Sequence, residues 1–272
     1  MKKIVIDPVT RVEGHLKIET LVDGGEVKEC HSSGTLFRGF EIFLKGHDPR
    51  DAPRITQRVC GVCPSVHGTA SVLSLDSAFG IDDKIPDNGR IIRNLILGSN
   101  CIQSHILHFY HLTALDYVDV TSVADYTGRN PELTHVKNFI ERGQLSPFFP
   151  RYEGDYRLSK EANITSVGHY IEALKIRRLA QEMLTLFGGK MPHNVGVVAG
   201  GVTSPLTTDK LPNFLWRLNT CREFINNVYL PDVLAVAEVY SDYFGIGKGC
   251  GNFVSYGVFD LETKEKDLTV RK

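Results

Sequence analysis

The chain has 272 residues, enough for one large domain or two ordinary ones, and 42% apolar with 23% charged residues indicates a globular protein. The formal net charge of −1 argues against a broad basic surface for nucleic acid or for an anionic membrane. No apolar run is long enough to cross a bilayer, and residues 1–7 lack the apolar core of a secretory signal. The sequence therefore predicts no nucleic-acid partner, no membrane span and synthesis in the cytoplasm.

The first 36 residues carry short segments in which apolar and polar residues alternate. Such alternation over residues 4–6, 16–20 and 27–30 is typical of strands, and Asp23-Gly24-Gly25 is a favourable turn between the last two. Residues 1–36 are therefore predicted to form a small antiparallel β region with one solvent-exposed face.

After Gly39 the sequence becomes mainly helical, so the predicted fold class is mainly α with a small N-terminal antiparallel sheet (α+β). Helical spacing of apolar residues predicts a short helix after Asp51, one after Pro64, and others at about 88–115, 131–141, 161–187, 208–227 and 231–244. Residues 37–260 are predicted to form this helical region. Residues 261–272, with seven charges, are predicted to be a charged tail or the point where a longer chain was truncated.

Two of the six cysteines lie close together, in the segment Cys60-Gly-Val-Cys63. Because no secretory signal is predicted, a disulfide framework is not expected, and the pair indicates metal or redox chemistry. Pro64 favours a helix start, which makes Cys63 the N-cap residue and predicts a lowered thiol pKa near the helix dipole. The isolated cysteines are predicted to be buried as small apolar residues: Cys30, Cys101, Cys221 and Cys250.

Several interpretations of the cysteine pair stay open at this level. A structural zinc site needs four ligands, and this stretch offers three, counting His67 one turn after Cys63. A thioredoxin-like pair would follow a strand, whereas both flanks here are predicted to be helical. The thiols can also belong to a metal site completed by distant ligands, or be unrelated. His67 is either a ligand or a donor to a cysteine sulfur.

Three further groups carry candidate chemistry. Glu13 lies between Arg11 and His15, which fits a proton relay or, with more support from the residues alone, a surface charge cluster. Glu41 lies in an apolar segment, where an ion pair with Arg38 is favoured over a Mg²⁺ site. A polar stripe on the predicted helix 88–115 is interpreted as hydrogen-bonded core histidines rather than a metal site: Asn94, Gly98, Cys101, His105 and His108.

Taken together, the motifs resemble the large subunit of [NiFe]-hydrogenases. The resemblance rests on three motifs and on shorter stretches that extend along nearly the whole chain: Arg58-x-Cys60-Gly-x-Cys63-x-x-x-His67, Arg11-Val-Glu13-Gly-His15 and Phe37-Arg-Gly-x-Glu41. It implies an oxidoreductase that reversibly converts H₂ to protons and electrons at a Ni–Fe centre whose iron carries CO and cyanide.

The resemblance also implies a role for each site residue. Cys60 would be a terminal nickel ligand, and Cys63 would bridge nickel and iron. His67 would donate to the sulfur of Cys63, Glu13 would be the proton exit, and Glu41 would bind Mg²⁺. The implied partner is a small subunit bearing iron–sulfur clusters, and periplasmic export or membrane association would depend on that partner.

The sequence departs from the family pattern in one important respect. Family members carry a second Cys-x-x-Cys near the C-terminus, and no such motif follows Cys63 here. The sequence is therefore interpreted as the N-terminal half of a large subunit, which needs the second half to retain the Ni–Fe centre. Alternatives are a non-catalytic hydrogenase-fold subunit of an electron-transfer complex and a zinc-binding module.

Overall fold

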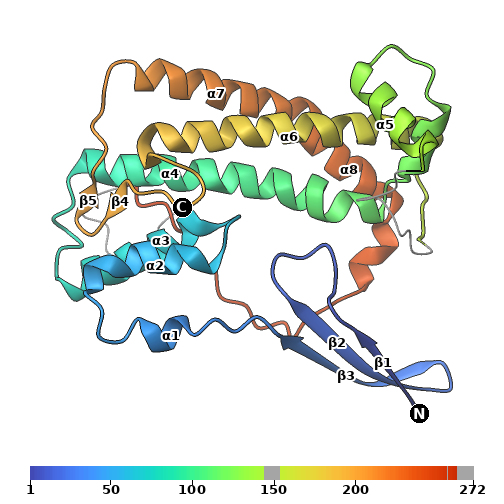
Figure 1. Ribbon diagram of the computed structural model, residues 1–272, viewed down its shortest axis with the longest axis horizontal. Coiled ribbons are helices and arrows are strands. Elements are labelled where there is room, and N and C mark those ends of the chain that lie inside the picture. The colour runs from blue at the N-terminus through green and yellow to red at the C-terminus, as the bar shows by residue number, and fades with distance from the viewer. Residues whose placement is uncertain (144–153, 256, 262–272) are drawn as a thin grey trace.

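The computed structural model describes residues 1–143, 154–255 and 257–261, and it is mainly helical. Figure 1 shows long helices in a layered body and a small sheet at one corner. The α-helices are α1 (Phe40–Phe43), α2 (Ala52–Thr56), α3 (Pro64–Ala78), α4 (Asp87–Ile106), α5 (Pro131–Glu141), α6 (Lys160–Gly188), α7 (Lys210–Phe224) and α8 (Leu230–Val239). The strands are β1 (Lys2–Ile6), β2 (Leu16–Asp23), β3 (Glu26–Gly34), β4 (Val197–Val198) and β5 (Gly201–Val202).

The predicted helices are confirmed, with differences at their ends. Helix α5 has the predicted bounds, and α6 is one residue longer at each end than predicted. The predicted helix 88–115 is α-helical only to Ile106 and continues as the wider π turn Leu107–Thr113 and the 3₁₀ turn Ala114–Asp116. The C-terminus of α7 likewise passes into a π turn at Ile225–Tyr229. The Gly-rich segment between α6 and α7 contains the two-residue strands β4 and β5.

The N-terminal sheet is antiparallel in the order β1-β2-β3, as predicted. Gly24 and Gly25 have φ values of +60° and +83°, the left-handed conformation that a two-residue hairpin turn requires. The prediction that only one face meets solvent is wrong for the described residues. Strand β1 is exposed along its whole length, and its apolar residues Ile4, Val5 and Ile6 are 40–50% exposed. No described helix covers this sheet.

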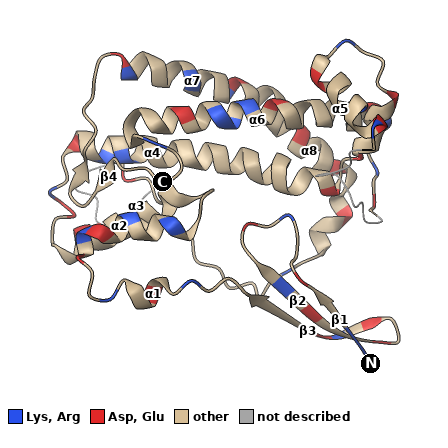
Figure 2. Ribbon diagram, viewed as in Figure 1, with Lys and Arg blue, Asp and Glu red and all other residues tan. Residues whose placement is uncertain are grey.

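The core lies between the long helices, where α6 packs against α4 on one side and α7 on the other. One cluster of buried side chains joins α3, α4, α6 and α7: Val72, Ile92, Ile96, Met183, Leu184, Phe187 and Phe214. Two further clusters of buried side chains extend the core along α6 toward α5. Figure 2 shows that α4 carries no Lys, Arg, Asp or Glu over its second half, which runs beside the basic middle of α6.

A buried ion pair ties α3 and α4 to the β4–β5 hairpin. Arg93 Nη1 lies 2.6 Å from Asp76 Oδ2, and the Arg93 side chain is 8% and the Asp76 side chain 1% exposed. Arg93 also donates to the carbonyl oxygens of Val198 at 2.6 Å and Gly201 at 3.0 Å. The second Asp76 oxygen accepts the Gly200 amide at 2.7 Å. The pair therefore holds the C-terminal end of α3 in place against α4 and the hairpin.

Asn130 is the N-cap residue of α5, and its side-chain oxygen accepts the amides of Glu132 and Leu133. We expect Asn130→Ala to lower the free energy of unfolding by about 1 kcal/mol, because two helix N–H groups lose their acceptor. Urea unfolding monitored by circular dichroism measures the change. Asn130→Ser keeps a capping oxygen, so this control should lose much less, and an equal loss in both variants would contradict the capping role.

Candidate metal centre

The two cysteines occupy one turn between the helical segment that ends at Val59 and helix α3. Cys60 is extended, and Cys63 is the N-cap residue with Pro64 at the first helical position, as predicted. Cys60 Sγ accepts the amide of Val62 at 3.3 Å and that of Cys63 at 3.1 Å. These two N–H groups fix the position of the Cys60 sulfur within the turn.

Two other predicted residues approach the sulfurs from separate elements. Glu13 Oε1 lies 3.7 Å from Cys60 Sγ, and His67 Nε2 lies 3.7 Å from Cys63 Sγ. Glu13 belongs to the loop between β1 and β2, which is tied to the helical body by an ion pair of 2.9 Å between Arg11 Nε and Asp116 Oδ1. The structure thus brings together Glu13, Cys60, Cys63 and His67.

The predicted lowering of the Cys63 pKa is wrong for the metal-free chain. Burial raises the pKa of the Cys63 thiol to about 12, and hydrogen bonding and negative charge at Cys60, with negative charge at Glu13, act in the same direction. The position at the helix N-terminus does not lower the pKa of this thiol, because burial and neighbouring negative charge act in the opposite direction. A bound cation would supply the missing positive charge.

Side chains on both sides of the turn hold its backbone. Arg38 donates to the carbonyl oxygens of Arg58, at 2.9 Å, and Val59, just before Cys60. Gln103, 1% exposed on α4, donates from Nε2 to the Val62 oxygen at 3.2 Å. Sequence reasoning missed both contacts. For Gln103 the available signal was an amide at a buried position of a helix, since a buried amide needs hydrogen-bond partners.

The predicted Arg38–Glu41 ion pair is wrong within the described residues. The Arg38 guanidinium faces backbone carbonyls and lies 5.0 Å from the ring centre of Phe40. Glu41 is exposed on α1, so its carboxylate needs no buried partner. The neighbouring apolar side chains Phe37 and Ile42 are 74% and 66% exposed, so this segment lies at the surface and Glu41 is not buried in it.

The isolated cysteines and the histidine stripe also differ from expectation. Only Cys221 is fully buried; Cys101 is half-buried, whereas Cys30 and Cys250 are exposed. The predicted core histidines, His105 near the end of α4 and His108 in the π turn that follows it, are exposed, so the C-terminal part of the stripe faces outward. It lines an open cavity of about 490 Å³ beside α3, together with the buried Asn100: Val66, Asn100, Cys101, Ser104, His105 and His108.

The donor set at the turn suits a soft metal but is incomplete. Two cysteine sulfurs on one turn are suitable for nickel, iron or zinc. Among the described residues, no group of three or more His, Cys, Asp or Glu side chains is placed to hold a metal ion. A four-ligand zinc site is therefore not built by the described part of the chain, and a metal at this turn requires further ligands.

Comparisons with known proteins agree with this donor chemistry. A family profile described as nickel-dependent hydrogenase matches residues 38–271, and a profile described as HoxL-like matches residues 3–33. The chain belongs to the nickel-dependent hydrogenase family. This confirms the resemblance based on the motifs, and the mainly helical fold with a small antiparallel sheet agrees with it.

This hydrogenase-family chain is similar to several hydrogenase large subunits. The periplasmic [NiFeSe] hydrogenase large subunit of Desulfomicrobium baculatum is 45% identical, covering 99% of this chain and 49% of the relative. The hydrogenase-2 large chain of Escherichia coli (strain K12) is 36% identical, covering 97% and 51%. A crystal structure of the reduced, active Ni-Fe-Se hydrogenase from D. baculatum superposes with a TM-score of 0.84 and 44% identity, covering 99% and 52%. The chain spans about half the length of these relatives.

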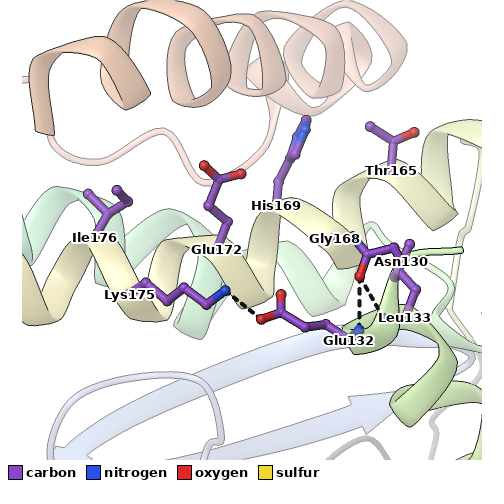
Figure 3. Close-up of a pocket in the computed structure, with 9 residues that line it drawn as sticks. All are labelled: Asn130, Glu132, Leu133, Thr165, Gly168, His169, Glu172, Lys175 and Ile176. Atoms are coloured by element: carbon purple, nitrogen blue, oxygen red, sulfur yellow. Dashed lines mark hydrogen bonds and ion pairs between the residues drawn. The ribbon is translucent and has the colours of Figure 1, made fainter. Parts of the chain in front are cut away.

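Away from the thiols, the hydrogenase-family chain has a polar groove of about 560 Å³ between α5 and α6. Figure 3 shows Lys175 and Glu132 paired across it, while His169 and Glu172 point away from that pair. Asp232 Oδ2 on α8 lies 2.8 Å from His169 Nδ1 and accepts the Tyr110 hydroxyl at 2.7 Å. This carboxylate therefore joins α8 to α6 and to the π turn Leu107–Thr113 that follows α4.

We expect this contact to make stability depend on pH. The hydrogen bond to Asp232 raises the pKa of His169 above its ordinary value, against the opposing effect of burial. Protonated His169 therefore stabilises the fold fully below about pH 6.5, and this stabilisation is lost as pH rises through the raised folded pKa. Urea unfolding at a series of pH values should show that loss. In His169→Gln it should be absent, and in His135→Gln, on the exposed side of α5, it should remain; an unchanged pH dependence in His169→Gln would contradict the assignment.

Proposed function

We propose that this chain forms the half of a nickel–iron hydrogenase large subunit that supplies two of the four cysteine ligands of the Ni–Fe centre. The proposed reaction is the reversible conversion of H₂ to two protons and two electrons. One observation carries the proposal: Cys60 and Cys63 share one turn, with Glu13 at one sulfur and His67 at the other, each at 3.7 Å. Two cysteine sulfurs would be suitable soft ligands for such a centre, and they would account for two of its four thiolates.

The proposed roles come from the family resemblance, and the contacts described above support them. Cys60 would hold nickel, and Cys63 would bridge nickel and an iron that carries CO and cyanide. His67 would donate from Nε2 to the Cys63 sulfur, withdrawing electron density from the bridge. When bound, the Ni–Fe centre would supply the two-electron chemistry that protein side chains lack.

Glu13 is proposed to move protons between the site and water. Its Oε1 accepts a hydrogen bond from Cys60 Sγ at 3.7 Å, which would give a direct path for a proton between the sulfur and the carboxylate. The residue is exposed, so a proton received from the sulfur side can leave to solvent. The neighbouring Arg11 pairs with Asp116 instead, at 2.9 Å.

The remaining parts of the enzyme are proposed to come from outside these residues. They are the other two thiolates, the further ligands of a Mg²⁺ ion held in part by Glu41, and a small subunit with iron–sulfur clusters that takes the electrons. The described residues contain no helix that is long and apolar enough to span a membrane. Any periplasmic or membrane location would follow that small subunit.

Nickel analysis and H₂ uptake test the proposal. The 272-residue chain alone should bind less than stoichiometric nickel and show no H₂ uptake. Assembly with the second half of the large subunit and the small subunit should give nickel, iron and H₂-dependent dye reduction. Stoichiometric nickel with activity in the chain alone would contradict the two-half arrangement, and an assembled protein without nickel or H₂ uptake would contradict the hydrogenase proposal.

A further inference from the structure

A buried amide on α4 contacts the backbone of the cysteine turn. Gln103 Nε2 donates to the Val62 carbonyl at 3.2 Å and to Ser104 Oγ at 3.1 Å. Val62 lies between the two cysteines, and its own N–H donates to Cys60 Sγ. The position of the Val62 peptide therefore affects both how Cys60 is hydrogen-bonded and where Cys63 enters helix α3.

The other end of this amide is held by a cation from α6. Gln103 Oε1 accepts from Nε and from Nη2 of Arg177, each at 3.3 Å. Arg177 Nη1 faces His111 Nδ1 at 3.4 Å, and His111 Nε2 lies 3.2 Å from the Tyr170 carbonyl. Burial lowers the pKa of His111 to about 4, so the neutral ring donates from Nε2 to that carbonyl and accepts at Nδ1.

Arg177 has an unusual environment for a half-buried charge. Across residues 1–143, 154–255 and 257–261, no carboxylate lies within ion-pair distance of it, and its hydrogen-bond partners are the neutral Gln103 and His111. A partly buried cation without a counter-ion is costly to stability. Its partner Gln103 is the side chain that contacts the cysteine turn.

The chemistry of these groups fixes the orientation of the amide. A guanidinium group has only donors, so it can contact Oε1 of Gln103 but not Nε2. With Oε1 facing Arg177, Nε2 must face the Val62 carbonyl, which can only accept. Without Arg177 the Gln103 amide could turn over by 180°. Its Oε1 would then face the Val62 carbonyl oxygen, and no hydrogen bond would form between them. The cation therefore enforces the hydrogen bond to the turn.

We propose that Gln103 and Arg177 are positioning residues that preset the Cys60–Cys63 turn for chelation. The contacts stand by themselves, and only the identity of the chelated group as a Ni–Fe centre rests on the proposed function. Arg177 acts through Gln103 and does not touch either sulfur. Both side chains come from helices that pack together in the core, so the turn takes its geometry from the rigid part of the fold.

Phenylarsine oxide tests this proposal without nickel. Its arsenic forms bonds to two thiol sulfurs and releases one water, with no change of oxidation state, so its affinity reports how well two thiols are placed. The 272-residue chain would carry Cys30→Ser and Cys250→Ser to remove the exposed single thiols. Competition with a small dithiol then gives a dissociation constant for each variant, and thermal unfolding checks the fold.

We expect Gln103→Met and Arg177→Met each to weaken arsenical binding about tenfold, equivalent to about 1.4 kcal/mol and typical of one buried hydrogen bond. The double variant should lose no more than the larger single loss, because both act through one contact. Arg177→Lys keeps a donor and should restore most of the affinity. Gln103→Glu keeps the Arg177 partner but loses the donor to Val62, so it should remain weak even with an unchanged melting temperature.

Arg178→Met, an exposed neighbour on the same helix, is the matched control and should bind the arsenical like the parent chain. The proposal is overturned if Gln103→Glu binds as tightly as the parent, or if the single losses add. If Arg177→Met does not fold, Gln103→Glu and Arg177→Lys still decide the question. Because this readout needs no H₂ chemistry, its failure is distinguishable from failure of the hydrogenase proposal.

Discussion

Cys63→Ser is expected to remove nickel from the assembled hydrogenase and to lower H₂ uptake by more than about 100-fold, beyond the 10–100-fold loss typical of residues that only support a ligand. Serine is nearly isosteric, but its hydroxyl is a hard oxygen that stays protonated at neutral pH. It therefore could not replace the soft thiolate that we propose as a ligand of the Ni–Fe centre. Nickel and iron content, measured alongside H₂-dependent dye reduction, gives the result.

The fold should survive this substitution. The Cys63 side chain makes no capping hydrogen bond to α3, and its backbone amide, which donates to Cys60 Sγ, is retained. Cys250→Ser is the matched control, because that cysteine is exposed and distant in sequence from the turn, and it should keep nickel and activity. Normal metal content in Cys63→Ser would show that this sulfur is not a ligand.

His67→Gln should give the smaller loss that distinguishes a supporting residue from a ligand. Its Nε2 lies 3.7 Å from Cys63 Sγ, and its proposed role is to tune that sulfur rather than to bind metal. The comparison between the two variants therefore separates the two roles that the sequence pattern alone left open for His67.

The sequence predicted the elements well because local signals were strong. Pro64 started α3, Gly189 ended α6 with a φ of +82°, and Gly24-Gly25 formed the predicted turn. The spacing of apolar residues predicted the long helices correctly, because the helices that bury these side chains belong to the same chain. The pairs Glu13–Cys60 and Cys63–His67 came from motif knowledge, and the structure brings each pair within 3.7 Å.

The failures share a different cause. Exposure of β1, of the α4 stripe and of the segment around Glu41 depends on what covers each surface, which local pattern cannot specify. Gln103 and Arg177 were missed because their contact joins residues 74 positions apart. The Cys63 pKa was mispredicted because burial and neighbouring negative charge outweigh the helix terminus.

Asp76→Asn is expected to lower the free energy of unfolding by about 3–5 kcal/mol, the usual cost of leaving a buried charge without its partner. Arg93 would stay 8% exposed and charged, with the carbonyls of Val198 and Gly201 as its remaining acceptors. The asparagine side chain also cannot match a carboxylate that accepts from both Arg93 and the Gly200 amide. Urea unfolding of the 272-residue chain measures the change.

The matched control lies on the same helix as Arg93. Asp87 is 71% exposed and pairs with Arg90 at 3.3 Å, so Asp87→Asn should change stability by less than about 1 kcal/mol. A loss below about 1 kcal/mol in Asp76→Asn would mean that water reaches Arg93 and that the pair is not a buried anchor. A large loss would instead identify Asp76 as the link that holds α3, and with it Cys63 and His67, against α4. Arsenical affinity of the folded fraction should then fall as well, because Gln103 and the cysteine turn approach each other only when α3 and α4 are correctly packed.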